Sequence, residues 1–207
     1  MENETIGAER LGERSLPAGR LSSLKSLRNP SCDLCPLHKE ASTVCVFGEG
    51  SGRLPVMILG EAPGQEEDRR GRPFVGASGK LLRSELLKAG LPLKKCYLTN
   101  TVKCYPKGTP NDGEVNTCST AYLQKEIQAC DPRYILALGR TATSALLPSY
   151  TFAEIRGQIN DSWLGKAFVF PVWHPAYILR NRGKTAEWRV DIENFVTLVE
   201  VDHGKLC

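Results

Sequence analysis

Short apolar runs alternate with helical patterns along most of the chain. Four runs have the length of buried strands and end at glycine, proline or polar residues, at positions 54–59, 96–99, 134–138 and 167–172. Strands that alternate with helices favour a parallel sheet with helices on both faces. We therefore expect an α/β fold, a single three-layer domain with a central, four-stranded, mostly parallel sheet.

Leucine and other apolar residues recur at helical spacing between these runs. Residues 78–88 predict an amphipathic helix that ends before Gly90, and a short helix precedes Pro30 near the N-terminus. Further helices are predicted over 114–128, 140–147 and 185–199.

Polar motifs follow three of the predicted strands. The segment GEAPGQEED, residues 60–68, comes after the first strand and reads as a loop, Asn100 ends the second, and His174 follows the last. In open parallel sheets, ligands bind outside the carboxyl ends of the strands. The sequence therefore predicts a binding site where these three segments meet.

Length and composition fit one globular domain with unstructured ends. The chain has 207 residues, of which 41% are hydrophobic and 24% charged. We expect a mobile tail over 1–20, a folded domain over 21–200 and a C-terminal tail over 201–207.

Targeting signals and charge narrow the function classes only slightly. No apolar run approaches the ~20 residues of a membrane-spanning helix, and the N-terminus lacks the apolar core of a secretory signal. We therefore expect a cytoplasmic, monomeric protein. The net charge of +4 is compatible with a phosphate-backbone partner but does not by itself indicate one.

Four of the eight cysteines have a metal-ligand pattern. Cys32 and Cys35 form a Cys-x2-Cys pair, and Cys104 and Cys118 follow with thirteen residues between them. Thiolates bind soft metals, and the wide second spacing is unusual for a compact zinc ribbon but acceptable for an iron–sulfur cluster. The pattern alone leaves zinc, an iron–sulfur cluster or no metal open.

The other four cysteines, Cys45, Cys96, Cys130 and Cys207, lie in apolar or terminal segments, where we expect inert thiols. His38 lies three residues after Cys35 and is expected to be solvated rather than a ligand, because four cysteines are already available.

Seven motifs together resemble the family 4 uracil-DNA glycosylases, the iron–sulfur branch of their superfamily. They occur in the order CDLCPLHK, VFGEG, GEAPGQEED, GRPFVGASG, LTNTVKCYP, LALGRTA and HPAYILR. The resemblance spans residues 21–200. It implies a [4Fe–4S] cluster on Cys32, Cys35, Cys104 and Cys118. It also implies hydrolysis of the N-glycosidic bond of uracil in DNA during base-excision repair, which releases uracil and leaves an abasic site.

Three residues have the chemistry that this reaction needs. The Asn100 carboxamide has a donor and an acceptor for O4 and N3–H of uracil, and Phe74 offers an aromatic face for a flipped base. His174 matches the family's residue that stabilises charge developing at O2 of the leaving uracil.

The GEAPG segment completes the expected substrate site with Gly60, Glu61 and Ala62. Relatives outside family 4 have a water-positioning aspartate where this chain has Ala62, so Glu61 and Glu67 are the nearby acidic candidates for that task. Where those relatives exclude thymine with a tyrosine, this chain has Gly64, and Glu67 or the pocket shape must take over. The alternative for Glu67 and its acidic neighbours is a solvated loop.

Basic residues after the histidine motif predict the DNA contact. Arg180, Arg182 and Lys184 can neutralise phosphates, and Tyr177 belongs to an apolar group suited to the gap left by a flipped base. The expected partner is single- or double-stranded DNA that contains uracil. A weaker expectation is that the N-terminal tail contacts a sliding clamp.

Two other functions fit the same motifs. The chain could be a catalytically silent, cluster-bearing protein that binds DNA or senses damage, or a glycosylase for another deaminated base, hypoxanthine or xanthine. A branch that bonds covalently to DNA through a histidine in a basic insertion is rejected, because residues 103–112 contain no histidine.

Overall fold

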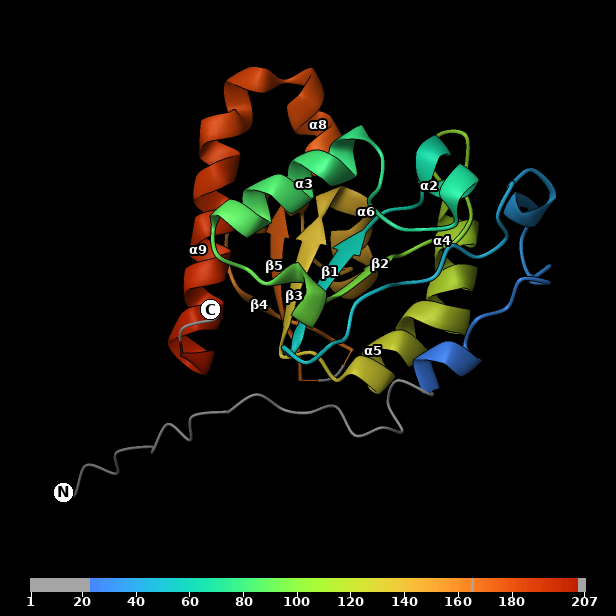
Figure 1. The fold of residues 1–207 in the computed structure, drawn as a ribbon, viewed down its shortest axis with the longest axis horizontal. Helices are drawn as coiled ribbons and strands as arrows, with labels where there is room; N and C mark the ends of the chain where they lie inside the picture. The colour runs from blue at the N-terminus through green and yellow to red at the C-terminus, as the bar shows by residue number, and fades with distance from the viewer. Residues whose placement is uncertain (1–22, 165, 205–207) are drawn as a thin grey trace.

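The computed structural model describes residues 23–164 and 166–204 and shows helices packed on both faces of a central sheet (Figure 1). The sheet has the strand order β2-β1-β3-β5-β4. Four strands are parallel: β1 (Val56–Gly60), β2 (Tyr97–Asn100), β3 (Tyr134–Leu138) and β5 (Phe168–Val172). The predicted α/β architecture is confirmed.

The predicted strand count is one too low. A fifth strand, β4 (Asn160–Asp161), pairs antiparallel with β5 at the edge of the sheet. Two polar residues are too few to show the alternation of apolar and polar positions that predicts a strand, so this segment was predicted to be irregular.

The helices divide between the two faces of the sheet. One face packs on α3 (Ala77–Lys88), α8 (Pro175–Arg180) and α9 (Thr185–His203). The other packs on α5 (Gln124–Cys130), α6 (Gly139–Leu146) and α7 (Phe152–Ile155). The alternation of strand side chains explains the division, since Ile58 and Leu136 face the first group whereas Met57 and Ile135 face the second.

Several helical segments differ from the sequence prediction, and the short helices α7 and α8 were not predicted at all. Helix α2 (Gln65–Arg70) lies inside the segment predicted as a loop. The predicted helix 114–128 consists of α4 (Asp112–Cys118), a π-helical turn (Ser119–Leu123) and α5. Helix α9 continues to His203, so residues 201–203 belong to it rather than to a C-terminal tail. The tail 1–20 and its expected sliding-clamp contact lie outside the described residues.

A third buried cluster lies beyond the sheet, among the N-terminal segment, the loop after β2 and the helix α4. Its buried members are Cys32, Leu37, Cys45, Phe47, Val102, Cys104, Cys118 and Tyr122. We call it the cysteine-side core. Short 3₁₀ turns, Pro36–Lys39, Leu93–Lys95 and Arg182–Lys184, complete the described elements. None of the helices in the described ranges is long and apolar enough to cross a membrane.

Candidate active site

The carboxyl ends of the four parallel strands bring the predicted site segments to one edge of the sheet. Gly60 and Asn100 are register partners at the ends of β1 and β2. Gly139 follows β3, and His174 lies two residues after β5. In Figure 1 the arrows of these strands point toward the end of the molecule where α8 lies. Parallel pairing thus assembles residues that are far apart in the sequence.

Gly60 is the contact point between Asn100 and Phe74. A Cβ atom built on Gly60 would overlap Asn100 Oδ1 and would lie 3.0 Å from Phe74 Cζ. The absence of a side chain at residue 60 therefore gives the carboxamide and the aromatic ring their shared space. The structure brings these three predicted substrate-binding residues together.

Phe74 is held in an unusual backbone conformation. Its φ is +56°, in the left-handed region that few non-glycine residues adopt. Arg83 fixes this loop, because its guanidinium donates to the carbonyl oxygens of Phe74 at 2.9 Å and Pro73 at 3.1 Å. Gly79 lets the first turn of α3 pack closely, since a Cβ atom there would overlap the Phe74 backbone. The ring itself is only 6% exposed.

Glu67 is buried in α2 and does not lie in a solvated loop, so that alternative is wrong for it. Its Oε1 accepts the backbone N–H of Gly76 at 2.7 Å, and its Oε2 would lie 2.8 Å from a Cβ atom on Gly64. The neighbouring Asp68 is also buried and accepts the backbone N–H groups of Ser42 and Thr43, both at 2.9 Å. Only Glu66 of this acidic run is exposed to solvent at the helix surface, where it pairs with arginines.

Glu61 and Ala62 lie on the stretch between β1 and α2. The Glu61 carboxylate accepts a hydrogen bond from the hydroxyl of Thr141, in the first turn of α6. Its carbonyl oxygen accepts the backbone N–H of Val102 at 2.9 Å. Ala62 packs against the cysteine-side core. This stretch therefore connects the strand ends to the cysteines.

His174 caps the N-terminus of α8. Its Nδ1 accepts the backbone N–H of Ala176 at 3.2 Å, and Pro175 occupies the first helical position, which suits its fixed φ. Burial, with a smaller effect of Arg180, lowers the pKa of His174 to about 4. The imidazole is therefore neutral at neutral pH, and because Nδ1 accepts, its proton resides on Nε2.

Gly139 allows His174 to approach the start of α6. Its φ is +82°, and a Cβ atom there would lie 3.0 Å from His174 Cβ. Thr141 and Gly139 were not among the predicted site residues. Their only sequence signal is that LALGRT places a glycine directly after a buried strand.

The four predicted metal ligands gather at the cysteine-side core. Cys32, Cys104 and Cys118 are buried members, and Cys35 packs against them. A capping box between Asn111 and Glu114 starts the helix that ends at Cys118. None of the described cysteines forms a disulfide.

Backbone N–H groups point at two of the sulfur atoms. The N–H of Cys45 donates to Cys104 Sγ at 3.4 Å, and the N–H of Lys103 donates to Cys118 Sγ at 3.3 Å. Ser119, next to Cys118, has a buried hydroxyl oxygen with no hydrogen-bond partner among the described residues. Donors around sulfur are a usual way to stabilise thiolate ligands.

Cys45 was predicted to be an inert thiol, but it lies inside this group. Its φ of +58° turns its N–H toward Cys104, and its thiol is in hydrogen-bond contact with Cys104 and Cys32. The thiol hydrogen bond from Cys45 lowers the pKa of Cys104 to about 7, whereas burial raises the pKa of Cys118 to about 12. Cys104 therefore has the strongest thiolate character of this pair.

No group of three or more His, Cys, Asp or Glu side chains within 23–164 and 166–204 is arranged to hold one metal ion. His38, expected to be solvated, directs its Nδ1 at the carbonyl oxygen of Cys35, 2.7 Å away. The four cysteines are thus neighbours in one buried core.

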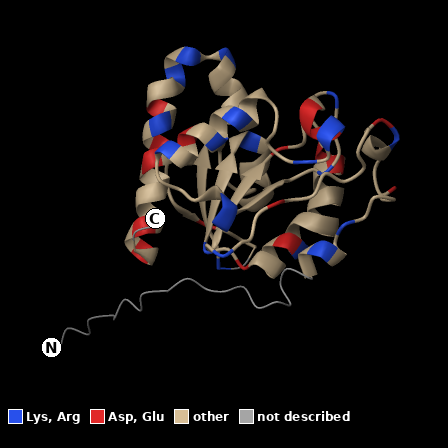
Figure 2. Ribbon diagram, viewed as in Figure 1, with Lys and Arg blue, Asp and Glu red and all other residues tan. Residues whose placement is uncertain are grey.

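Exposed cations surround the turn between α8 and α9 (Figure 2). Arg180 and Arg182 are exposed and form no ion pair with any residue that the structure describes. Lys184 pairs with Glu187 at 3.1 Å and lies 5.3 Å from the centre of the Trp173 ring, which also packs on Tyr177. The predicted DNA-contact residues therefore form one surface beside His174.

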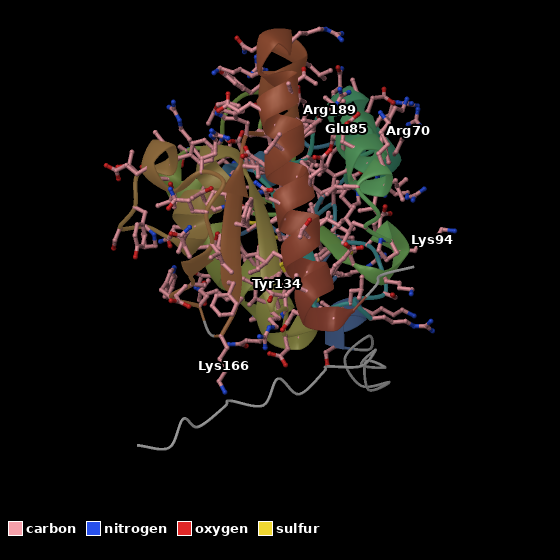
Figure 3. The ribbon with its side chains drawn as sticks, turned by 90° about the vertical axis from the view of Figure 1, so that its left-hand side faces the viewer. Arg70, Glu85, Lys94, Tyr134, Lys166 and Arg189 are labelled. Carbon is pink, nitrogen blue, oxygen red and sulfur yellow. The ribbon has the colours of Figure 1, made fainter. Side chains whose placement is uncertain are left out.

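Three other arginines, on α2 and α9, pair with neighbouring carboxylates. Arg189 on α9 pairs with Glu85 on α3 at 2.7 Å, and the two lie side by side in Figure 3. Arg69 and Arg70 both pair with Glu66. The α8–α9 turn differs from these sites because Arg180 and Arg182 have no ion pair among the described residues.

A parallel sheet that presents an amide, an aromatic ring and a neutral histidine at its strand ends has the parts of an enzyme that reads a planar base. The family model described as Uracil DNA glycosylase superfamily matches residues 47–195.

Similar curated proteins include three type-4 uracil-DNA glycosylases. The protein from Thermotoga maritima is 40% identical over 78% of this chain and 85% of its own length. Those from Pyrobaculum aerophilum and Archaeoglobus fulgidus are 38% and 34% identical, over 80% and 86% of this chain and 88% of each relative. The chain therefore belongs to the uracil DNA glycosylase superfamily, in its type-4 branch.

Proposed function

We propose that this protein is a uracil-DNA glycosylase, a hydrolase that cleaves the N-glycosidic bond of uracil in DNA and leaves an abasic site for base-excision repair. The observation that carries this function is the meeting of Asn100 and Phe74 at Gly60, with a histidine whose Nε2–H is a donor at the same edge of the sheet. The names of the relatives and the family match of residues 47–195 support it. That match lies within the proposed catalytic domain, 21–200.

Base recognition would be divided between Asn100 and Phe74. A glycosylase must extrude its base from the duplex and read the hydrogen-bonding edge. The Asn100 amide can donate to O4 and accept from N3–H, a combination that cytosine does not satisfy. The Phe74 ring would supply the apolar surface against the base.

His174 would stabilise the leaving group. As the glycosidic bond breaks, negative charge grows on uracil O2, and a donor aimed at that position lowers the barrier. The Ala176 N–H on Nδ1 fixes the tautomer with the proton on Nε2. A neutral imidazole donates this hydrogen bond without first taking up a proton, in agreement with its lowered pKa.

We assign different tasks to the two acidic candidates. Glu61, half-buried at the strand ends and fixed by Thr141, is the candidate to orient the attacking water. Glu67 is directed at the Gly76 N–H, which starts α3 directly after the Phe74 loop. We propose that Glu67 positions this loop and thereby the pocket wall that excludes a thymine methyl group.

The cysteine-side core is proposed to bind a [4Fe–4S] cluster through Cys32, Cys35, Cys104 and Cys118. The N–H donors to Cys104 and Cys118 sulfur fit such ligands. When bound, the cluster would supply a covalent brace between the N-terminal segment, the loop after β2 and α4.

Arg180, Arg182, Lys184 and Tyr177 are proposed to contact DNA beside the pocket. The two arginines without a carboxylate partner in the described chain would neutralise phosphates. The Trp173 ring supports Tyr177 and Lys184, which would keep the α8–α9 turn in place.

The test is release of free uracil from single-stranded and U:G oligonucleotides under single-turnover conditions. His174→Ala is expected to lower the rate by about 100- to 1000-fold, the usual cost of losing one donor to a developing anion. His203→Ala, at the far end of α9, is the matched control and should keep the wild-type rate. No release by cluster-loaded wild type would contradict the proposal and favour a DNA-binding protein or another base.

A further inference from the structure

A fully buried ion pair contacts the main chain of Asn100. Lys103 and Glu126 are both 0% exposed, and the Lys103 ammonium contacts Glu126 Oε2. Lys103 lies in the loop after β2, three residues beyond Asn100, and Glu126 lies on α5. An apolar pair of similar volume is often at least as stable as a buried ion pair, so stability alone does not account for these residues.

All three donors of the Lys103 ammonium are used. Besides Glu126, they reach the hydroxyl of Thr99 at 2.8 Å and the carbonyl oxygen of Asn100 at 2.5 Å. An ammonium has three N–H donors, so none remains unsatisfied. One of the three holds the main chain of the residue proposed to read uracil.

Glu126 also binds side chains of β2. Its carboxylate accepts the hydroxyl of Tyr97 at 2.9 Å and that of Thr99 at 3.1 and 3.2 Å. The network therefore holds Tyr97, Thr99 and Asn100, three of the four residues of β2. The N–H side of the Asn100–Thr101 peptide is held by β1, because Thr101 donates to the carbonyl oxygen of Gly60 at 2.9 Å. The Lys103 ammonium holds the carbonyl side of the same peptide, so both of its polar groups are fixed.

The main chain of Lys103 is anchored on the cysteine side. Its N–H donates to Cys118 Sγ at 3.3 Å, and its carbonyl oxygen accepts the N–H of Val46 at 2.7 Å. Lys103 thus connects two regions that the fold otherwise builds separately, the cysteine-side core through its backbone and Asn100 through its ammonium.

We propose that Lys103 is a positioning residue for base recognition, whose buried ammonium fixes the Asn100 peptide and hence the orientation of the carboxamide that reads uracil. The inference rests on the proposed function and goes beyond it, because Lys103 touches no substrate atom. Small errors in the placement of a recognition group reduce rates strongly.

The test replaces the ion pair with an apolar pair, Lys103→Met/Glu126→Leu, which removes the ammonium without leaving a buried charge alone. Three quantities are measured: the single-turnover rate of uracil release, the Kd for abasic-site DNA, and the visible absorption of the cluster. We expect the rate to fall about 10- to 100-fold, with the Kd within about twofold and unchanged absorption per protein, because Asn100 contacts only the base.

Arg189→Met/Glu85→Leu is the matched control, since it removes an ion pair with a buried carboxylate between α3 and α9, away from the strand ends. This control is expected to excise uracil at the wild-type rate. A wild-type rate in folded Lys103→Met/Glu126→Leu would overturn the inference. A parallel loss of rate and of abasic-site affinity would also overturn it, because that result indicates a general structural role.

A second variant keeps the test decisive if the double substitution does not fold. Thr99→Val removes one hydroxyl that contacts both charged groups and keeps the shape of a β-branched strand residue. It should slow release roughly fivefold, as expected for one hydrogen bond, and a wild-type rate would overturn the inference. An inactive wild-type protein would instead contradict the proposed function itself, so the two failures are distinguishable.

Discussion

The proposed base-binding pocket and the cysteine-side core are built in different ways. The pocket uses the carboxyl ends of parallel strands, where register alone places Gly60 opposite Asn100. The cysteine-side core uses irregular segments outside the sheet, with a left-handed Cys45 backbone and N–H groups aimed at sulfur. The difference indicates that the sheet defines the pocket. The cysteine-side core instead depends on contacts among separate segments of the chain: the N-terminal segment, the loop after β2 and α4.

The largest predicted effect breaks the pocket without touching the cysteines. Gly60→Ala puts a methyl group into the space of Asn100 Oδ1 and against the Phe74 ring. We expect the rate of uracil release to fall by about 100-fold, since displacement of a recognition group by about 1 Å has that effect. Cluster absorption should remain.

Gly108→Ala is its control, because the nearest atom to a Cβ there is 4.0 Å away. A Gly60→Ala protein with wild-type kinetics would show that Asn100 and Phe74 are not the base-reading pair.

The next prediction breaks the cysteine-side core. Cys118→Ser removes a proposed ligand from the end of α4, and we expect loss of iron and a Tm lower by on the order of 10 °C, because metal binding contributes to folding. Cys96→Ser is the matched control, because Cys96 is buried between the sheet and the helices α3, α8 and α9 rather than in the cysteine-side core. This variant should retain full iron content. Full iron content in Cys118→Ser would remove this residue from the ligand set.

The third prediction concerns the pH dependence of uracil release, which tests His174 and not the cysteine-side core. The folded pKa of His174 is lowered from its ordinary 6.5 to about 4. Single-turnover release should therefore be insensitive to this group from neutral pH to about pH 5 and change only near pH 4, where protonation of Nδ1 breaks its hydrogen bond with the Ala176 N–H. A rate profile with a midpoint near 6.5 that is absent from His174→Ala would contradict the assignment.

The lowered pKa of His174 also makes the stability of the folded protein depend on pH. Between pH 6.5 and 4 the unfolded chain binds a proton at His174 and the folded chain does not. The contribution of this histidine to stability is therefore present above pH 6.5 and is lost as the pH falls toward 4. Urea denaturation of the wild type and of His174→Ala across this range would measure it, and an equal pH dependence in both would contradict the shift.

The smallest predicted effect sharpens the role of Cys45. Cys45→Ala removes the thiol donor to Cys104 but keeps the backbone N–H donor. A donor to a thiolate favours the more reduced cluster, so the midpoint potential should become more negative by about 40 mV, equivalent to one hydrogen bond of about 1 kcal/mol. An unchanged potential would show that the thiol does not act on the cluster.

The sequence predicted the pocket better than the cysteine-side core for a physical reason. Asn100 ends one buried strand and His174 follows another by two residues, and buried strands give a continuous apolar signal that indicates where they end. The edge strand β4 and the helix α2 were missed because they are short and polar.

Contacts between loops that are distant in the sequence leave no pattern comparable to the apolar run of a buried strand. Nothing in the pattern around Cys45 indicates a positive φ or proximity to Cys104. Likewise, Lys103 reads as an ordinary loop lysine, and only the fold brings Glu126 to it. The buried position of Glu67 also depends on the fold, because α2 turns it toward Gly76.

The central claim is that Asn100, Phe74 and His174 form one base-reading pocket, and a crystal structure of the protein with free uracil tests it most directly. The account predicts uracil against the Phe74 ring, its O4 and N3 on the Asn100 amide, and its O2 within about 3 Å of His174 Nε2. Uracil bound away from the strand ends, or with O2 facing another donor, would contradict it.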